Sequence, residues 1–109
     1  MEKHEVVFLQ AALDDLDEIT IYIARDSKQA ALRFRDKLIA RAHSLASLPM
    51  LGVAVPVEKI GRHGFRMLME GKYLIFYKVY GKRVVILRVL HGMRDYPRLL
   101  AYGTEGLDS

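Results

Sequence analysis

The sequence predicts an α+β fold, in which a helical hairpin packs on one face of a small antiparallel sheet. Apolar residues recur every three or four positions from residue 10 to about residue 48, which is the period of amphipathic helices. After residue 64 the segments become short and rich in β-branched and aromatic residues, as in strands. Helices that precede a run of strands are typical of α+β architecture, and the expected order is β-α-α-β-β-β.

The first strand is expected at residues 5–9, which are apolar and β-branched. A helix is expected from residue 10 to about residue 24. Its buried side is predicted to hold Leu9, Leu13, Leu16, Ile19, Tyr22 and Ile23, and its exposed side Asp14, Asp15, Asp17 and Glu18. Asp26 and Gln29 have the spacing of a capping box and predict the start of a second helix, which continues to about residue 48.

Residues 49–63 are expected to form a connection with a short extended piece at 53–57. Strands are then predicted at 65–70, 73–80 and 83–90, separated by Gly-Lys turns that favour antiparallel hairpins. The last strand is apolar at nearly every position, which indicates a central strand covered on both faces. A helical turn is expected within 94–101 and a frayed end at 103–109.

The net charge of +4 is unevenly distributed over the 109 residues, which suit one domain. Residues 1–27 hold seven acids and two bases, and the remainder holds six acids and fifteen bases. A basic body attracts polyanions or an acidic protein partner, although a high isoelectric point also serves solubility alone. The chain has no cysteine, no apolar run of transmembrane length and no secretion signal, so we expect a soluble cytoplasmic protein that spans no membrane.

Charged and titratable side chains gather near the end of the chain: Arg88, His91, Arg94, Asp95 and Tyr96. Arg88 interrupts an apolar strand, so its guanidinium requires a partner or an open face. One interpretation is a structural ion pair, in which Arg88 or Arg94 binds Asp95 or Glu70. The alternative is a cationic pocket, in which Arg66, Arg88 and Arg94 converge on an anionic ligand such as phosphate.

Histidine and tyrosine side chains also allow two interpretations each. His91 follows the last strand, where it could act as a general acid or cap the strand end by hydrogen bonding. Tyr73 and Tyr77 are expected on one face of the middle strand and Tyr80 on the other. These tyrosines suit base stacking or core packing with the hydroxyl at the rim. The histidines are isolated from one another, and neither a metal nor another cofactor is expected.

Six segments follow one another along the chain: Ala12-x-x-Asp15-Leu16-x-x-Ile19-x-x-Tyr22-Ile23, Ala30-Ala31-x-x-Phe34, Leu48-Pro49-x-x-Gly52, Gly64-x-Arg66-x-Leu68, Tyr73-Leu74-Ile75-Phe76-Tyr77-Lys78-Val79 and Val85-Ile86-Leu87-Arg88-Val89-Leu90-His91-Gly92-Met93-Arg94-Asp95. Over roughly residues 5–100 this series resembles the RelE/ParE toxin superfamily of type II toxin–antitoxin systems, often labelled plasmid stabilisation proteins. The resemblance implies a cytoplasmic toxin with a cognate antitoxin as its partner. It also implies that operator DNA is bound only through the antitoxin.

Within that superfamily, RelE-like members cleave mRNA on the ribosome, whereas ParE-like members poison DNA gyrase without a nuclease site. A nuclease would draw its catalytic residues from Arg66, Arg88, His91 and Arg94. RelE-type nucleases, however, place an arginine where this chain has Leu74 and a tyrosine in the stretch where it has Leu99 and Leu100. Leucine cannot stabilise a developing phosphorane charge, so the resemblance favours a ParE-like gyrase inhibitor. Its expected target-binding residues are Arg66, Arg88, Arg94 and Tyr96.

Overall fold

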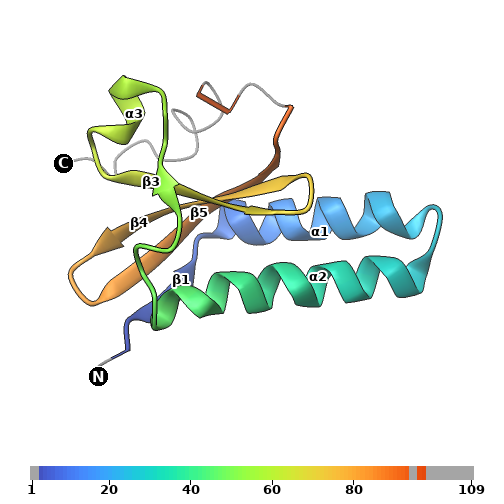
Figure 1. The fold of residues 1–109 in the computed structure, drawn as a ribbon. Helices are drawn as coiled ribbons and strands as arrows, with labels where there is room; N and C mark the ends of the chain where they lie inside the picture. The colour runs from blue at the N-terminus through green and yellow to red at the C-terminus, as the bar shows by residue number, and fades with distance from the viewer. Residues whose placement is uncertain (1–2, 94–95, 98–109) are drawn as a thin grey trace.

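A computed structural model describes residues 3–93 and 96–97 of the chain. In chain order the elements are β1 (Glu5–Phe8), α1 (Gln10–Ala24), α2 (Lys28–His43), η1 (Ser44–Ala46), β2 (Val53–Ala54), α3 (Glu58–Gly61), β3 (Phe65–Glu70), β4 (Tyr73–Tyr80) and β5 (Arg83–His91). One sheet has the strand order β1-β5-β4-β3-β2, and α1 and α2 pack side by side against it (Figure 1). The α+β prediction is therefore confirmed.

The sheet is mixed, whereas the sequence predicted an antiparallel one. Strands β2 to β5 pair antiparallel, but β1 runs parallel to β5, with Glu5 opposite Arg83 and Phe8 opposite Ile86. The pattern of a short apolar strand is compatible with both parallel and antiparallel pairing, so the sequence does not determine the direction in which β1 pairs. The central position expected for the last strand is confirmed, because β5 lies between β1 and β4.

Both expected Gly-Lys turns are present in the β3–β4 and β4–β5 hairpins. Gly71 and Gly81 have φ values of 60° and 58°, which favour glycine at the first turn position. The extended piece expected at 53–57 is reduced to the two residues of β2, and it leads into α3, which the sequence did not predict.

The second helix begins with a different cap from the one predicted. The side chain of Ser27, not Asp26, accepts a hydrogen bond from the backbone N–H of Ala30 at 3.1 Å. Ser27 has extended backbone angles, as a helix N-cap requires, and a serine oxygen is among the preferred caps. The helix ends at His43 and continues as the 3₁₀ turn η1, so its helical course stops short of residue 48.

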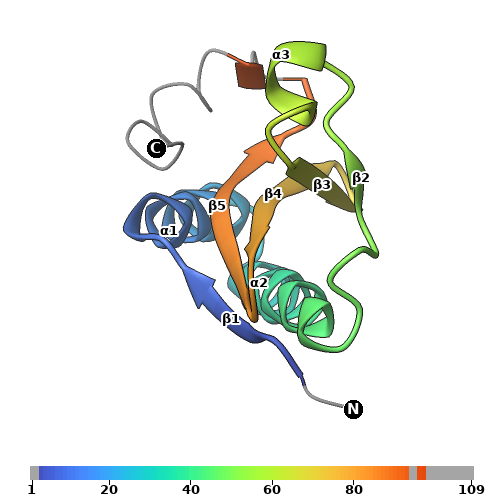
Figure 2. The ribbon, with the colours of Figure 1, turned by 90° about the vertical axis from the view of Figure 1, so that its left-hand side faces the viewer.

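Each face of the sheet carries its own hydrophobic cluster. Leu16 and Leu38 of the helices pack on one face with Ile75, Tyr77 and Ile86. On the other face, buried side chains of β3, β4 and β5 lie beneath residues of the 55–60 segment and Tyr96. In Figure 2, α3 lies at the top of the view, away from α1 and α2. The sheet therefore has no broad open face among the described residues.

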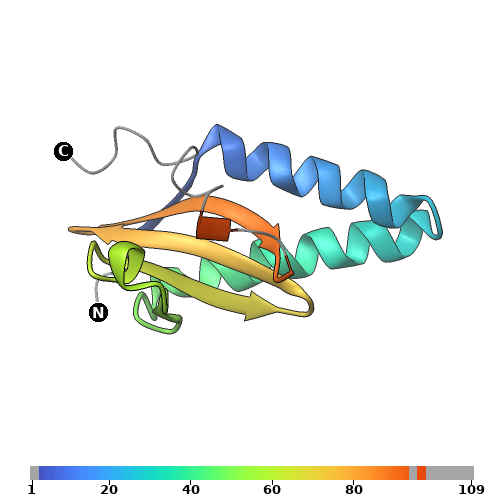
Figure 3. The same ribbon diagram turned by 90° about the horizontal axis from the view of Figure 1, so that it is seen from above.

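The helical hairpin is longer than the sheet that it covers. Its tip, where α1 ends and α2 begins, projects past the strands (Figure 3). Ile21 and Tyr22, near the end of α1, are 66% and 63% exposed. This projecting part carries apolar side chains that the sheet does not cover.

Candidate functional site

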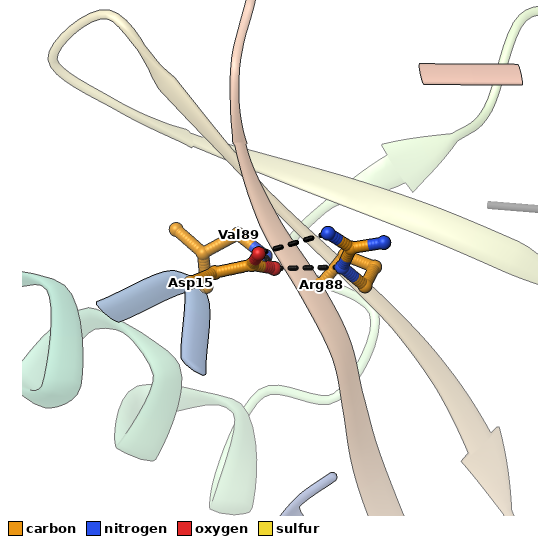
Figure 4. Close-up of polar contacts among 3 residues, drawn as sticks. All are labelled: Asp15, Arg88 and Val89. Carbon is orange, nitrogen blue, oxygen red and sulfur yellow. Dashed lines mark hydrogen bonds and ion pairs between the residues drawn. The ribbon is translucent and has the colours of Figure 1, made fainter. Parts of the chain in front are cut away.

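One buried carboxylate joins α1 to β5. Asp15, which is 6% exposed, accepts hydrogen bonds from Nε of Arg88 at 2.8 Å and from its Nη2 at 2.9 Å (Figure 4). Asp15 also accepts the backbone N–H of Val89 at 2.9 Å. On this edge β1 pairs only with residues 83–86 of β5, so at Val89 no neighbouring strand accepts the backbone N–H. The carboxylate of Asp15 accepts it instead. The hydrogen bond to Asp15 raises the pKa of Arg88, so the guanidinium stays charged.

The buried position of Asp15 corrects the sequence prediction, which placed it with the exposed acids. The residues of α1 that are buried are Ala12, Asp15, Leu16 and Ile19. Tyr22, predicted to be buried, is exposed. Arg88 forms a structural ion pair, as one interpretation of the sequence expected, but with Asp15, a carboxylate that was not considered for it; Asp95 lies outside the described residues.

A β-bulge sets the direction of Arg88. Tyr77 of β4 is opposite Ile86 of β5, but Phe76 is opposite Arg88, so Leu87 is an extra residue between these two pairs. Ile86 belongs to the cluster under the helices, and Phe76 belongs to the cluster on the other face. Without the bulge, regular alternation would place Arg88 on the helix-covered face.

Arg66 is bound to backbone carbonyls of the loop between η1 and β2. Its Nη2 donates to the carbonyl oxygen of Gly52 at 2.5 Å and to that of Met50 at 3.3 Å, while its buried Nε has no protein partner. Arg66 is opposite Tyr77, whose hydroxyl accepts the N–H of Gly52 at 2.9 Å. Together these two side chains fasten the loop to the helix-covered face of the sheet.

The structure does not bring Arg66 and Arg88 together. By register Arg66 shares a face with Tyr77, whereas Arg88 lies opposite Phe76 on the other face. Arg66 binds backbone carbonyls and Arg88 binds a carboxylate, so both bind groups of the protein itself. The described residues therefore form no arginine pocket of the kind expected for phosphate. Arg94 lies outside the described residues.

His91 and Tyr73 lie side by side at the end of β5. Nδ1 of His91 accepts the backbone N–H of Met93 at 3.1 Å, which is the strand-capping role considered from the sequence. The rings of His91 and Tyr73 meet edge to face, with their centroids 5.3 Å apart. The ring centroid of Phe34 lies 5.5 Å from that of Tyr73. Burial raises the pKa of Tyr73, and Tyr22 raises it further. Tyr73 and Tyr77 share a face and Tyr80 packs on the other, as predicted.

Leu74 and Tyr96 both contribute to the cluster on the face away from α1 and α2. Leu74 is 7% exposed. The ring of Tyr96, half-buried, lies 5.1 Å from that of Phe76. RelE-type nucleases have an arginine at the position of Leu74. The side chain of such an arginine would start from within this apolar cluster.

A groove lies between α1 and the C-terminal part of β5, and the sequence analysis did not predict it. It has a volume of about 780 Å³ and is lined by acidic and apolar residues of α1, by residues of β5 and by Lys72 and Tyr73. A signal that could have indicated it is Ile21, an apolar residue of α1 outside the face predicted to be buried.

The described residues contain neither a cluster suited to a metal ion nor a helix suited to span a membrane. No group of three or more histidine, aspartate or glutamate side chains is placed to hold a metal ion. No helix there combines the length and the apolar composition needed to cross a membrane.

Comparisons with known proteins agree with this fold. The model of the family described as "ParE toxin of type II toxin-antitoxin system, parDE" matches residues 6–96. A chain of the chromosomal ParDE toxin–antitoxin system of P. aeruginosa is 21% identical with a TM-score of 0.67, over 82% of this chain and 96% of that chain. A chain of the toxin–antitoxin complex RelBE2 of Mycobacterium tuberculosis is 24% identical with a TM-score of 0.62, over 82% of this chain and 98% of that chain. No curated protein matches the sequence.

Proposed function

The chain belongs to the ParE toxin family of type II toxin–antitoxin systems, and on this basis we propose that it stops growth by binding DNA gyrase. A cognate antitoxin neutralises it and carries the complex to operator DNA. The toxin acts in the cytoplasm and by protein contact, without a nuclease reaction.

The placement of Arg66 and Arg88 on opposite faces of the sheet carries this proposal. A ribonuclease needs cationic side chains around one scissile phosphate, where they stabilise the charge that develops in the transition state. Here the two arginines are separated by the sheet and are bound to groups of the protein. The buried Leu74 supports the same conclusion, since an apolar side chain occupies the position of a nuclease arginine.

The gyrase contact that we propose centres on Arg94 and Tyr96, beside the exposed Met93. Met93 is 88% exposed, and a charged residue next to apolar and aromatic ones is typical of interface anchors. Arg88 supports this surface indirectly, because it is held near the end of β5, the strand that leads into residues 93–96.

A supercoiling assay with purified gyrase tests the proposal. Titration with the toxin is expected to inhibit supercoiling and to accumulate cleaved DNA, and Arg94→Ala is expected to weaken both effects. Arg83→Ala is the matched control, because Arg83 is exposed and lies 4.0 Å from Glu5 at the other end of β5. Unaffected gyrase at every toxin excess, together with discrete cuts in translated mRNA, would overturn the proposal in favour of a ribosome-dependent endonuclease.

A further inference from the structure

The two long helices carry opposite charges. Helix α1 has four acidic residues and no basic one, a balance of −4, whereas α2 has five basic residues and one acidic residue, a balance of +4. The helices lie side by side (Figure 2), so one half of the hairpin is acidic and the other is basic. An uneven distribution of this kind orients charged partners, and α2 is the half that attracts a polyanion. Its basic residues are Lys28, Arg33, Arg35, Lys37 and Arg41.

Three of these bases form one row along the helix, which we call the α2 row. Arg33, Lys37 and Arg41 are spaced four residues apart, so they lie on successive turns. From Arg33 to Arg41 the helix rises by about 12 Å. Arg35 marks the side that faces α1, because its Nη2 lies 4.0 Å from Asp17. Arg33 and Lys37 lie about 160° around the helix axis from Arg35, so the row faces away from α1.

The α2 row has an energetic cost that the protein itself does not offset. Like charges four residues apart destabilise a helix. In the contacts among the described residues, none of the three side chains forms a hydrogen bond or an ion pair with another group of the protein. The one acid of the helix, Asp36, lies about 100° around the axis from Lys37 and so outside the row. A cation in the last turn favours the helix dipole, but of the three only Arg41 lies there.

The surroundings of the α2 row suit a phosphate backbone better than a protein. Protein interfaces are typically built around apolar and aromatic side chains. The one exposed large apolar side chain of α2 is Leu32, which lies within about 60° of Arg35 and therefore on the α1 side. Phe34, the ring closest to the row along the helix, is half-buried against Tyr73 and is not placed to stack on unpaired bases. Evenly spaced cations on a rigid helix instead complement the evenly spaced phosphates of a duplex.

We propose that the α2 row binds the phosphate backbone of duplex DNA. The inference rests on the proposed function, since gyrase, the target that we propose, holds duplex DNA while it acts. The toxin then has two contact surfaces, one around Met93 and Tyr96 for the enzyme and the α2 row for the DNA. Tyr96 belongs to the cluster on the face of the sheet away from α2, so the two surfaces lie on different faces. Phosphates repel the acidic α1, which fixes the orientation in which the hairpin approaches the duplex.

Contacts of this kind have a recognisable signature in solution. Contacts to phosphates position a protein on DNA but do not read its sequence, so duplexes of unrelated sequence should bind with similar affinity. Each phosphate that a basic side chain neutralises releases counterions, so the affinity should fall steeply as salt is added. Bound phosphates also relieve the repulsion along the row. We therefore expect duplex DNA to raise the melting temperature of the protein.

Fluorescence anisotropy with the purified protein and a labelled duplex of about three helical turns tests the proposal, without gyrase and without the antitoxin. The row variant carries Arg33→Gln, Lys37→Gln and Arg41→Gln. It is expected to bind the duplex at least about tenfold more weakly than the natural chain at low salt. Its slope of log affinity against log salt concentration should be smaller by about 2–3, because three phosphate contacts are lost.

The matched control carries Lys59→Gln, Arg62→Gln and Arg83→Gln, which remove three positive charges at exposed positions outside α2. It should change the affinity by less than about threefold and the salt slope by less than about 1. Thermal unfolding monitored by circular dichroism verifies that both variants fold. The row variant should be at least as stable as the natural chain, because its repulsion along the helix is gone and glutamine is as good a helix former as lysine.

No binding of the duplex, equal losses in the row and control variants, or tighter binding of single-stranded RNA than of the duplex would overturn the inference. A toxin that binds DNA through the α2 row but leaves gyrase unaffected would overturn the proposed target alone. Inhibition of gyrase that is as strong in the row variant as in the natural chain, with no binding of DNA by either, would overturn only the inference about α2.

Discussion

Asp15 and Arg88 stand 73 positions apart in the chain, yet two hydrogen bonds of 2.8 and 2.9 Å join their side chains at the edge of β5. The same carboxylate binds the N–H of Val89, so one residue of α1 fixes both a side chain and the backbone of the central strand. This contact fixes the position of α1 relative to β5.

Asp15→Ala is expected to lower the free energy of unfolding by about 2–4 kcal/mol, because a largely buried guanidinium and a backbone N–H lose their acceptor. Urea denaturation measures the change. Asp14→Ala, at the exposed neighbour, should change stability by less than about 0.5 kcal/mol. Replacing the pair by Asp15→Leu with Arg88→Met should recover part of the loss, since both charges are removed, whereas the N–H of Val89 still lacks the carboxylate. Equal stability of Asp15→Ala and the natural chain would contradict a structural role for the pair.

Gly52→Ala is expected to destabilise the protein by about 1–3 kcal/mol through overpacking. An added Cβ at Gly52 would lie 2.5 Å from the carbonyl oxygen of Met67 and 2.8 Å from the ring and hydroxyl of Tyr77. Gly92→Ala is the control, because its nearest neighbour, the carbonyl oxygen of Lys72, would be at an ordinary 3.5 Å. Thermal melts of both variants test the difference, and equal melting temperatures would show that the loop shifts without cost.

Leu74→Arg is expected to cost about 3–5 kcal/mol, because it places an unpaired charge in the apolar cluster beside Phe76. Met69→Arg, at the position opposite Leu74 on β3, is the matched control, since Met69 is 65% exposed. Urea denaturation of the two variants gives the comparison. A stable Leu74→Arg protein that cuts translated mRNA would instead indicate a nuclease scaffold.

Tyr73 should make the protein sensitive to alkali. Its pKa is raised in the folded state above the ordinary value near 10, so the folded protein holds this proton more tightly than the unfolded chain does. The contribution of protonated Tyr73 to the free energy of unfolding is therefore fully present below the pKa of Tyr73 in the unfolded chain. It is lost as the pH rises from there through the pKa of Tyr73 in the folded protein. Tyr73→Phe should lose less stability than the natural chain over that interval, as measured by urea denaturation at a series of pH values. Parallel losses in both proteins would contradict the assignment.

The order of the longer elements, β1, α1, α2, β3, β4 and β5, could be predicted from the sequence because each has its own period and its own turn residues. Three strands are predicted by the Gly-Lys turns at 71–72 and 81–82. The central position of β5 is predicted by its apolar run. The direction of β1 could not be predicted, because pairing on either edge in either direction buries the same side chains. The Ser27 cap was missed because Asp26 offers the same chemistry one position earlier.

The site was harder to predict than the fold. Asp15 sits among four acids of α1, and only the positions of Ala12, Leu16 and Ile19 distinguish it as the inward one. Arg88 was recognised as anomalous, but its partner is far away in sequence and the bulge that aims it has no sequence signature. The groove depends on how the helical hairpin packs on the sheet and extends past it. The periodicity of the sequence predicts helices and strands but not how they pack together.

The parallel pairing of β1 with β5 has a consequence for how the protein is made. Glu5 is synthesised 78 residues before its neighbour Arg83. The sheet edge and the Asp15–Arg88 contact therefore close only after β5 has been synthesised, and contacts of such long range slow folding. Until β5 is available, α1 lacks the strand against which it packs in the folded protein.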